Sequence, residues 1–203
     1  MSVATIQIVC TGNICRSPMA EGLLDHLLRQ RRISSVSVES AGTAGWEGSR
    51  ATREAIEAMR EQELDITGHA ARRLQPQMIE AADLVVAMSG EHLEAAVEMA
   101  PDAADRTFTL KELVRLLDRF PGHKDLDRAD ERLREAVRWA AAARATSVGR
   151  GPQDDVPDPL GLSLESFRAT AWELGGLCER LVDGLFGQGW EERIRIDSAA
   201  LWG

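Results

Sequence analysis

Four short stretches of the chain have the apolar pattern of β-strands. Residues 4–9 (ATIQIV) predict a buried strand, residues 34–39 (SSVSVE) alternate like a strand with two different faces, and residues 83–87 (DLVVA) predict a third. A weaker strand pattern covers residues 106–109. Predicted helices separate the strands, and this order favours an α/β fold with a four-stranded parallel sheet flanked by helices.

Helices are predicted where apolar residues recur three or four positions apart. The first follows Ser17, which suits a helix N-cap, and Pro18, which suits the first helical position. Two more are predicted over residues 49–62 and 90–99, and another closes the chain. The apolar positions of the first and last helices are Leu23, Leu24, Leu27, Leu28, Phe167, Ala171, Leu174, Cys178, Leu181 and Leu185.

Residues 111–150 follow a different pattern. LKELVRLLDRF predicts a helix that stops at Pro121-Gly122, and a second helical stripe runs from Leu126 to Ala140 with a strongly charged opposite face. We expect this second helix to pack on the surface of the domain, and packing on a partner chain is the alternative. The loop GRGPQDDVPDPLG follows.

Composition and charge limit the classes of protein that fit. The 203 residues are 44% hydrophobic and 28% charged, which is typical of one packed domain. The formal net charge of −9 disfavours general binding of nucleic acid or of an anionic membrane surface. No apolar run approaches the roughly 20 residues of a membrane span, and we expect no signal peptide from the N-terminal sequence.

The cysteines indicate a reducing environment. Cys10, Cys15 and Cys178 are odd in number and irregularly spaced, so the sequence does not indicate a disulfide framework. We therefore expect reduced thiols and a cytoplasmic location. Cys178 lies on the apolar stripe of the last helix and is expected in the core.

The stretch CTGNICRS connects the first predicted strand to the first predicted helix. The N–H groups from Thr11 to Ser17 can surround a tetrahedral oxyanion there, and the helix dipole adds positive character. Gly12 permits a backbone conformation that a Cβ would resist, and Arg16 supplies a planar fork of donors for two phosphate oxygens. These surroundings favour a thiolate at Cys10, which is the nucleophilic form of cysteine.

CTGNICRSPMAEG resembles the signature of the low-molecular-weight protein-tyrosine phosphatases. Cys-x5-Arg alone is a weak signal, but four further stretches match the family in its own order. They are SAGTAGWEG at 40–48, GHAARRL at 68–74, ADLVVAM at 82–88 and VPDPLG at 156–161. The resemblance therefore covers most of residues 4–186.

The resemblance also implies a domain organisation. Residues 1–187 are expected to form a single phosphatase domain with the Rossmann-like fold of that family. Typical members are shorter, so residues 111–150 are interpreted as a helical insertion, and the C-terminal tail, residues 188–203, lies outside the resemblance and has no assigned role.

The resemblance implies a two-step mechanism without metal or organic cofactor. Cys10 attacks the phosphorus in line and forms a cysteinyl-phosphate, while Arg16 and the loop amides hold the equatorial oxygens. Asp158, in the Asp-Pro pair of VPDPLG, protonates the leaving oxygen and then activates water. Asp154 and Asp155 are near in sequence but do not match the family position.

We name residues 10–17 the phosphate loop. Its expected phosphate-binding residues are Thr11, Gly12, Asn13, Ile14, Cys15, Arg16 and Ser17. By resemblance, the Ser17 hydroxyl supports the thiolate, and Asn13, Ser40 and His69 form a network that holds the loop in shape. Simple helix capping is the alternative for Ser17, and a surface or packing role is the alternative for His69.

Cys15 has two interpretations. It matches the second cysteine of relatives that form a disulfide with the nucleophile under oxidation, and such a bridge would protect Cys10 from overoxidation. The alternative is a small apolar loop residue. No nearby His/Cys pair completes a metal site with these two cysteines.

Three related activities compete for the substrate. Ile14 stands where protein-arginine phosphatases have a threonine, and its apolar side chain suits an aromatic ring. Leu160 stands where the family often has an aromatic residue, and Trp46 is expected to form part of the opposite wall, with core packing as its alternative. Arsenate reductases need further cysteines, which residues 82–100 lack.

These observations predict a hydrolase of protein phosphotyrosine, with a protein-arginine phosphatase as the main alternative. A catalytically inactive phosphate-binding module would lack Cys10, Arg16 or Asp158, and all three are present. The charged insertion is a separate candidate for binding a partner or a second copy of the chain.

Overall fold

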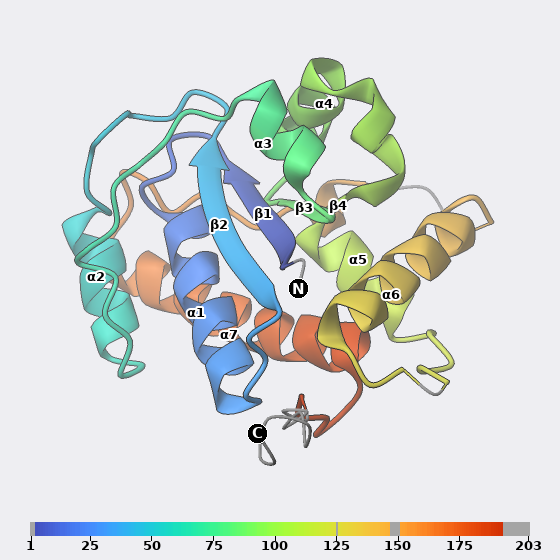
Figure 1. The fold of residues 1–203 in the computed structure, drawn as a ribbon. Coiled ribbons are helices and arrows are strands. Elements are labelled where there is room, and N and C mark those ends of the chain that lie inside the picture. Colours follow the sequence, from blue (N-terminus) through green and yellow to red (C-terminus); the bar gives the residue numbers. More distant parts are fainter. Residues whose placement is uncertain (1–2, 125, 147–150, 193–203) are drawn as a thin grey trace, which may run out of the picture.

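A four-stranded parallel sheet with helices on both faces organises the chain (Figure 1). The computed structural model describes residues 3–124, 126–146 and 151–192. The elements in chain order are β1 (Ala4–Cys10), α1 (Arg16–Gln30), β2 (Val36–Gly42), α2 (Arg53–Arg60), α3 (Pro76–Ala81), β3 (Leu84–Ala87), α4 (Gly90–Met99), η1 (Pro101–Arg106), β4 (Thr107–Thr109), α5 (Leu110–Leu117), α6 (Ala129–Arg144), η2 (Pro152–Asp154) and α7 (Leu164–Phe186). The strand order is β2-β1-β3-β4, and all neighbouring strands are parallel, as predicted.

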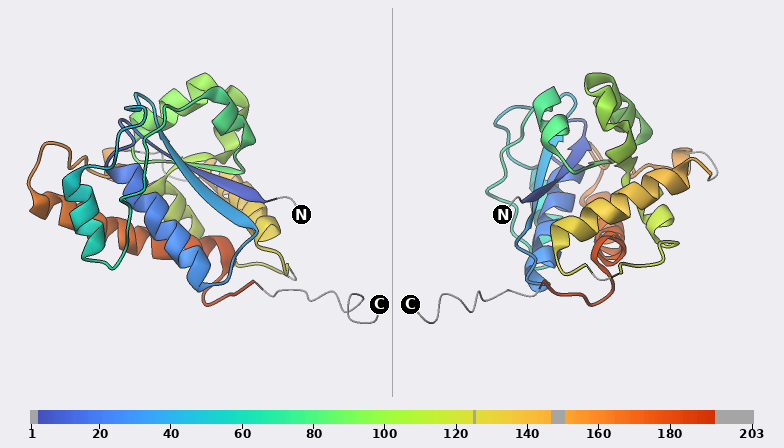
Figure 2. Two further views of the ribbon diagram at one scale, coloured as in Figure 1. Left: turned by 60° about the vertical axis from the view of Figure 1, so that its left-hand side comes forward. Right: turned by 45° about the vertical axis from the view of Figure 1, so that its right-hand side comes forward.

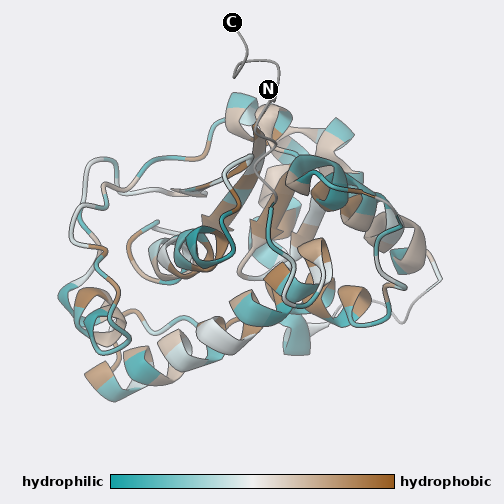
Figure 3. Cartoon of the chain, turned by 60° about the horizontal axis from the view of Figure 1, so that its bottom comes forward, coloured by the Kyte–Doolittle hydropathy of each residue, from teal (hydrophilic) through white to brown (hydrophobic). Residues whose placement is uncertain are grey.

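The two faces of the sheet pack against different helices because side chains alternate along each strand. Ile6, Ile8 and Val86 belong to a large core that includes side chains of α1, α5 and α7. Val9 and Val85 belong to a smaller core on the opposite face, with α3, α4 and η1. Figure 2 shows these helices on either side of the strands, and Figure 3 shows hydrophobic and hydrophilic residues alternating along them. The carboxyl ends of β1 and β3 are thereby held between two packed layers.

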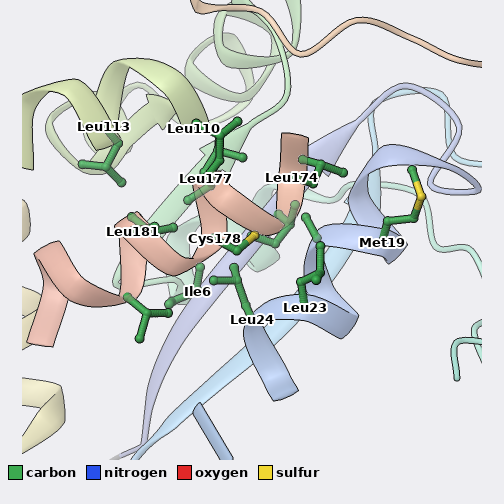
Figure 4. Close-up of a cluster of buried hydrophobic side chains, with 14 of the residues drawn as sticks. Ile6, Met19, Leu23, Leu24, Leu110, Leu113, Leu174, Leu177, Cys178 and Leu181 are labelled. Carbon is green, nitrogen blue, oxygen red and sulfur yellow. The ribbon is translucent and has the colours of Figure 1, made fainter. Parts of the chain in front are cut away.

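Cys178 lies inside the larger core. It is fully buried, and Ile6, Leu24 and Leu181 surround it (Figure 4). This burial raises the pKa of the Cys178 thiol far above its ordinary value. Core packing accounts for Cys178, as the sequence predicts.

The start of α1 differs from the prediction. The helix begins at Arg16 with Cys15 at the N-cap, so Ser17 and Pro18 are its second and third residues. The Ser17 hydroxyl contacts Cys10 Sγ at 2.9 Å, inside the loop. The N-cap prediction for Ser17 was wrong because the turn of the phosphate loop itself starts the helix, which carries the hydroxyl back toward β1.

Other element ends shift by a few residues. α4 coincides with the predicted helix over 90–99, but α2 is shorter than the predicted 49–62. It begins after Thr52, whose Oγ1 accepts a hydrogen bond from the N–H of Ala55 at 3.2 Å. The short elements α3, η1 and η2 were not predicted, because six residues or fewer carry too little periodicity.

The helix α6 packs within the chain. Its buried side chains face α5, α7 and η1. They are Ala129, Asp130, Leu133, Ala136, Val137 and Ala140. Of the two packing alternatives for this stripe, the structure has the intramolecular one.

Only part of the tail at residues 188–203 can be described. The Trp190 ring stacks on Phe186 with 6.3 Å between centroids, and the Arg132 guanidinium lies 4.4 Å from the Trp190 centroid. The prediction for residues 193–203 lies outside the described residues. Within the described ranges, no helix combines the length and the apolar character that a membrane crossing requires.

Candidate active site

Hydrogen bonds to its carbonyl groups anchor the phosphate loop to the surrounding chain. Each carbonyl oxygen from Cys10 to Cys15 accepts a hydrogen bond. The donors, in that order, are the N–H groups of Thr43 (2.9 Å), Ala44 (3.0 Å) and Trp46 (3.1 Å), the His69 ring (2.7 Å), and the N–H groups of Thr52 (2.9 Å) and Met19 (3.2 Å). These contacts fix the direction of every peptide group in the loop.

That direction leaves the amide groups facing the interior of the loop. In a trans peptide the C=O and N–H point opposite ways, and the described chain has no cis peptide. The N–H groups of Thr11, Gly12, Ile14 and Cys15 have no hydrogen-bond partner among the described residues. The loop therefore presents a ring of free donors, which is what an oxyanion site requires.

Asn13 gives the loop its shape. Its φ is 56°, the left-handed region that asparagine tolerates better than most residues. Its Nδ2 donates to Ser17 Oγ at 2.8 Å and to Ser40 Oγ at 2.7 Å, and its Oδ1 accepts from the Arg72 N–H at 2.8 Å. The expectation for Gly12 is corrected: Asn13, not Gly12, has the positive φ, and a Cβ on Gly12 would meet a side chain at 3.3 Å.

Ser40 and His69 extend this network behind the loop. The Ser40 hydroxyl donates to Glu21 Oε2 at 2.5 Å. The His69 Nε2 donates to the Asn13 carbonyl at 2.7 Å, and its Nδ1 lies 3.8 Å from the same Glu21 oxygen. The structure brings Asn13, Ser40 and His69 together as the resemblance implies. Glu21 was missed because helical periodicity does not distinguish it from a surface glutamate.

A glycine of β2 lets the strand approach the loop closely. A Cβ on Gly42 would lie 2.3 Å from the Thr11 carbonyl oxygen and 2.9 Å from the Asn13 nitrogen. No side chain fits at that separation. This close approach explains why a glycine stands at position 42, within the stretch SAGTAG.

Cys10 receives two hydrogen bonds at its sulfur. The Asn13 N–H donates to Sγ at 3.3 Å, and Ser17 Oγ lies 2.9 Å from it. Because Ser17 Oγ already accepts from Asn13 Nδ2, its own proton is free to point at the sulfur. Two donors aimed at one sulfur stabilise a negative charge on it.

Arg16 connects the phosphate loop to residues 151–163, which we name the acid loop. The guanidinium is buried, with Nη2 donating to Asp158 Oδ2 at 2.5 Å and Nη1 donating to the Val156 carbonyl at 3.2 Å. Its Nε has no partner among the described residues. The Asp158 side chain is 40% exposed and the Arg16 side chain 6%, so the carboxylate lies at the rim and the guanidinium lies inside.

A pocket of about 70 Å³ lies in front of the Cys10 sulfur. Its lining combines the residues predicted for the chemistry with those predicted for the substrate wall. They are Cys10, Thr11, Gly12, Ile14, Cys15, Arg16, Trp46, Asp158 and Leu160. Trp46 and Leu160 are 53% and 44% exposed, so core packing does not explain either of them.

The two other aspartates of the acid loop have structural partners. Asp154 is buried and accepts hydrogen bonds from the Gly151 N–H at 3.1 Å and from Arg115 Nη2 at 3.3 Å. Asp155 accepts from the Gly90 N–H at 2.8 Å. Neither of them lines the described pocket.

The Cys15 thiol contacts the residue before α2. Its Sγ lies 3.7 Å from Thr52 Oγ1. Burial raises the pKa of the Cys15 thiol to about 11, although the contact with Thr52 opposes the shift. Cys15 is therefore a thiol near neutral pH, and both loop cysteines are free of disulfides in this structure.

His92 was not predicted at the site. This buried side chain of α4 places Nε2 2.8 Å from Thr11 Oγ1 and Nδ1 2.7 Å from Ser89 Oγ. Burial, and then the charge of Arg16, lower the pKa of His92 to about 4. The imidazole is therefore neutral near pH 7. The sequence pattern of 90–99 indicates a helix but does not show what its first turn contacts.

Comparisons with known proteins agree with this geometry. The family model for low molecular weight phosphotyrosine protein phosphatase matches residues 5–130. The protein-arginine-phosphatase of Geobacillus stearothermophilus is 32% identical over 180 residues, which cover 89% of this chain and 95% of that protein. The probable low molecular weight protein-tyrosine-phosphatase EpsP of Ralstonia nicotianae is 33% identical over 147 residues, 70% of this chain and 98% of that protein.

A solved structure shows the same fold. The low molecular weight protein tyrosine phosphatase from T. tengcongensis superposes with a TM-score of 0.67 at 32% identity, covering 89% of this chain and 98% of that one.

Proposed function

Because the chain belongs to the low-molecular-weight phosphotyrosine protein phosphatase family, we propose that it hydrolyses phosphotyrosine in proteins through a cysteinyl-phosphate intermediate. One observation carries this proposal. The free N–H groups of the phosphate loop surround the space between Cys10 and Arg16. A tetrahedral phosphate in that space meets donors on several sides and a sulfur nucleophile on one.

The first step forms the bond between Cys10 Sγ and phosphorus and breaks the bond between phosphorus and the ester oxygen. The loop amides and Arg16 hold the three remaining oxygens and stabilise their charge in the transition state. The donors from Asn13 and Ser17 favour the thiolate before attack. The same two donors stabilise the sulfur when it leaves in the second step.

Asp158 is proposed as the acid of the first step and the base of the second. It gives a proton to the departing phenolate oxygen and later takes one from the water that attacks the cysteinyl-phosphate. In the present structure its carboxylate pairs with Arg16 Nη2. An incoming phosphate competes for that guanidinium and frees the Asp158 carboxylate, which takes up a proton from water or from the entering monoester and gives it to the leaving oxygen.

Phosphotyrosine fits the walls of the pocket. Three of its lining residues are apolar: Ile14 is buried, and Trp46 and Leu160 are about half exposed. A phenyl ring packs between an indole and aliphatic side chains.

Phosphoarginine is the second candidate. The relative from Geobacillus stearothermophilus, which matches this chain over 89% of its length, is named a protein-arginine-phosphatase. The cysteine chemistry serves both substrates equally, so the wall residues decide between them. Ile14 gives no hydroxyl to a guanidinium, and we therefore rank phosphotyrosine first.

The deciding experiment measures phosphate release from matched phosphotyrosine and phosphoarginine peptides. The parent is compared with Cys10→Ser, Asp158→Ala and Ile14→Thr, and with Glu165→Ala as a control carboxylate whose side chain is 81% exposed. We expect preference for phosphotyrosine, no turnover by Cys10→Ser, and a relative gain for phosphoarginine in Ile14→Thr. Preference of the parent for phosphoarginine would overturn the specificity and retain the mechanism.

We also propose that the site responds to oxidation. Peroxide would convert the Cys10 thiolate to a sulfenic acid, and Cys15 would displace its oxygen as water to form a disulfide. The raised pKa of Cys15, about 11, makes that step slow at neutral pH. After peroxide treatment, dithiothreitol should restore activity to the parent and much less to Cys15→Ala. Equal recovery would remove the proposal.

Reversible thiol chemistry of this kind suits a reducing compartment, and we therefore propose a cytoplasmic location for the protein.

Association through the region 111–150 stays a proposal, restricted to the exposed face of α6. Glu131 and Arg138 are exposed on that face, whereas its apolar face is buried within the chain. Charge reversal in the double variant Glu131→Arg, Arg138→Glu should weaken concentration-dependent association in light scattering. An unchanged oligomeric state would remove the idea.

A further inference from the structure

We propose that His92 is a positioning residue that sets the orientation of the Thr11 hydroxyl in the phosphate loop, and through it the guanidinium of Arg16. The inference rests on the proposed function, because its effect is exerted on a phosphate bound at that loop. The contacts form a continuous chain: Ser89 Oγ to His92 Nδ1 at 2.7 Å, His92 Nε2 to Thr11 Oγ1 at 2.8 Å, and Arg16 Nη2 to Thr11 Oγ1 at 3.4 Å.

Hydrogen-bond accounting gives Thr11 a specific role. A neutral imidazole has one N–H and one acceptor nitrogen. If the Ser89 hydroxyl donates to Nδ1, the Nε2–H donates to Thr11, and Thr11 Oγ1 accepts from both His92 and Arg16. Its own hydrogen is then directed away from both, into the pocket that Thr11 lines. This tautomer adds a side-chain donor to the ring of backbone amides.

The surroundings of His92 keep the ring in the neutral form that this arrangement needs. The residue is 4% exposed, and the positive charge of Arg16 acts on the ring. Asp155 and Asp158 act on the ring in the opposite sense but more weakly. A neutral His92 donates to Thr11 without adding a second cation beside Arg16.

The position of His92 connects the two loops of the site. The carbonyl of Met88 accepts the N–H of Val156 at 2.8 Å, and the N–H of Gly90 donates to Asp155 at 2.8 Å. The junction of β3 and α4, residues 88–92, thus holds the acid loop through its backbone. Through His92 it holds the phosphate loop as well. One short segment therefore sets the position of both loops.

Two substitutions separate the two contacts of the ring. The amide of glutamine reaches the position of Nε2, and the amide of asparagine reaches that of Nδ1. His92→Gln keeps the contact with Thr11 and loses that with Ser89, whereas His92→Asn does the reverse. The measurements are the dissociation constant of inorganic phosphate by calorimetry, kcat and KM for p-nitrophenyl phosphate, and thermal unfolding of each variant.

We expect His92→Asn to weaken phosphate binding and lower kcat by about five- to tenfold, as for the loss of one hydrogen bond near a charge. His92→Gln should stay within about threefold of the parent, since it retains that bond. In a Thr11→Val background, His92→Asn should have little further effect, because the hydroxyl through which it acts is gone.

Equal effects of the two His92 variants would overturn the proposal, and so would an undiminished effect of His92→Asn in the Thr11→Val background. Phosphate binding is measured without turnover. A parent that binds phosphate but hydrolyses no ester would contradict the proposed function, and the binding series would still decide the role of His92.

Discussion

The phosphate loop and the acid loop meet at one pocket but are held in different ways. Every carbonyl of the phosphate loop from Cys10 to Cys15 is hydrogen-bonded, and Asn13 alone makes three side-chain hydrogen bonds to neighbours. In the acid loop, Pro157, Asp158 and Leu160 are exposed, whereas Pro159 is buried. The carboxylate of Asp158 contacts only Arg16 and the N–H of Leu160 among the described residues.

This difference matches the two tasks of the site. Stabilising charge in a transition state requires donors that are already in place, because reorganising them would cost free energy during the reaction. A proton donor has to move between a resting partner and a leaving group. The firmly held phosphate loop carries Cys10, the proposed nucleophile, and the exposed tip of the acid loop carries Asp158, the proposed acid.

The largest expected effect comes from removing that acid. Asp158→Ala should lower kcat by about 10²- to 10³-fold for phenyl phosphate, whose leaving group needs a proton, and much less for dinitrophenyl phosphate. Inorganic phosphate should bind slightly more tightly, because the carboxylate no longer competes for Arg16. Equal losses of kcat for both esters would show that Asp158 does not act as the acid.

The next effect tests the rigidity of the phosphate loop. Asn13→Ala loses three side-chain hydrogen bonds and places a Cβ-bearing residue without polar contacts at φ 56°. We expect a loss of about 2–4 kcal/mol in the free energy of unfolding in urea. Asn13→Gly removes the same bonds without the backbone strain and should recover part of this loss.

Removing a side-chain hydrogen bond at the end of the acid loop should lower the free energy of unfolding by less than Asn13→Ala does. Ser163 caps α7, with its Oγ accepting from the Ser166 N–H at 3.4 Å. We expect Ser163→Ala to cost about 1 kcal/mol. A cost equal to that of Asn13→Ala would contradict the difference drawn between the loops.

Another prediction concerns the pH dependence of folding stability. Because the folded-state pKa of His92 is about 4, below the ordinary 6.5, the unfolded chain binds the extra proton first. The contribution of His92 to the free energy of unfolding is therefore complete above pH 6.5. It falls as the pH drops toward 4, by up to about 3 kcal/mol. Urea unfolding of the parent and of His92→Gln between pH 7 and 4 isolates this contribution. Parallel curves for the two proteins would contradict it.

The smallest expected effect is at the base of the acid loop. The Arg115 side chain is 42% exposed and lies 3.3 Å from Asp154, which also accepts from the Gly151 N–H. Arg115→Gln should therefore change the free energy of unfolding by less than about 1 kcal/mol. Activity should change little, and a large loss of kcat would show that the acid loop depends on this ion pair.

The sequence predicts what is local and periodic in this chain. The strands, the stripe of α7 with Cys178 in the core, and the proximity of Cys10, Arg16 and Asp158 all follow from pattern or resemblance. The N-cap of α1 and the left-handed residue of the loop do not, because they depend on which groups the loop contacts in space. Glu21 and His92 contact the loop network from helices whose sequence pattern resembles that of any surface helix.

The pairing of Arg16 with Asp158 makes the pocket selective by charge. Any ligand that contacts the buried guanidinium must displace the Asp158 carboxylate from it. A weakly charged ligand therefore gains little binding free energy from Arg16. A phosphate monoester carries close to two negative charges at neutral pH and can outcompete the carboxylate, whereas a sulfate ester carries one. We therefore expect the ion pair between Arg16 and Asp158 to disfavour binding of sulfate esters and small monoanions relative to phosphate monoesters.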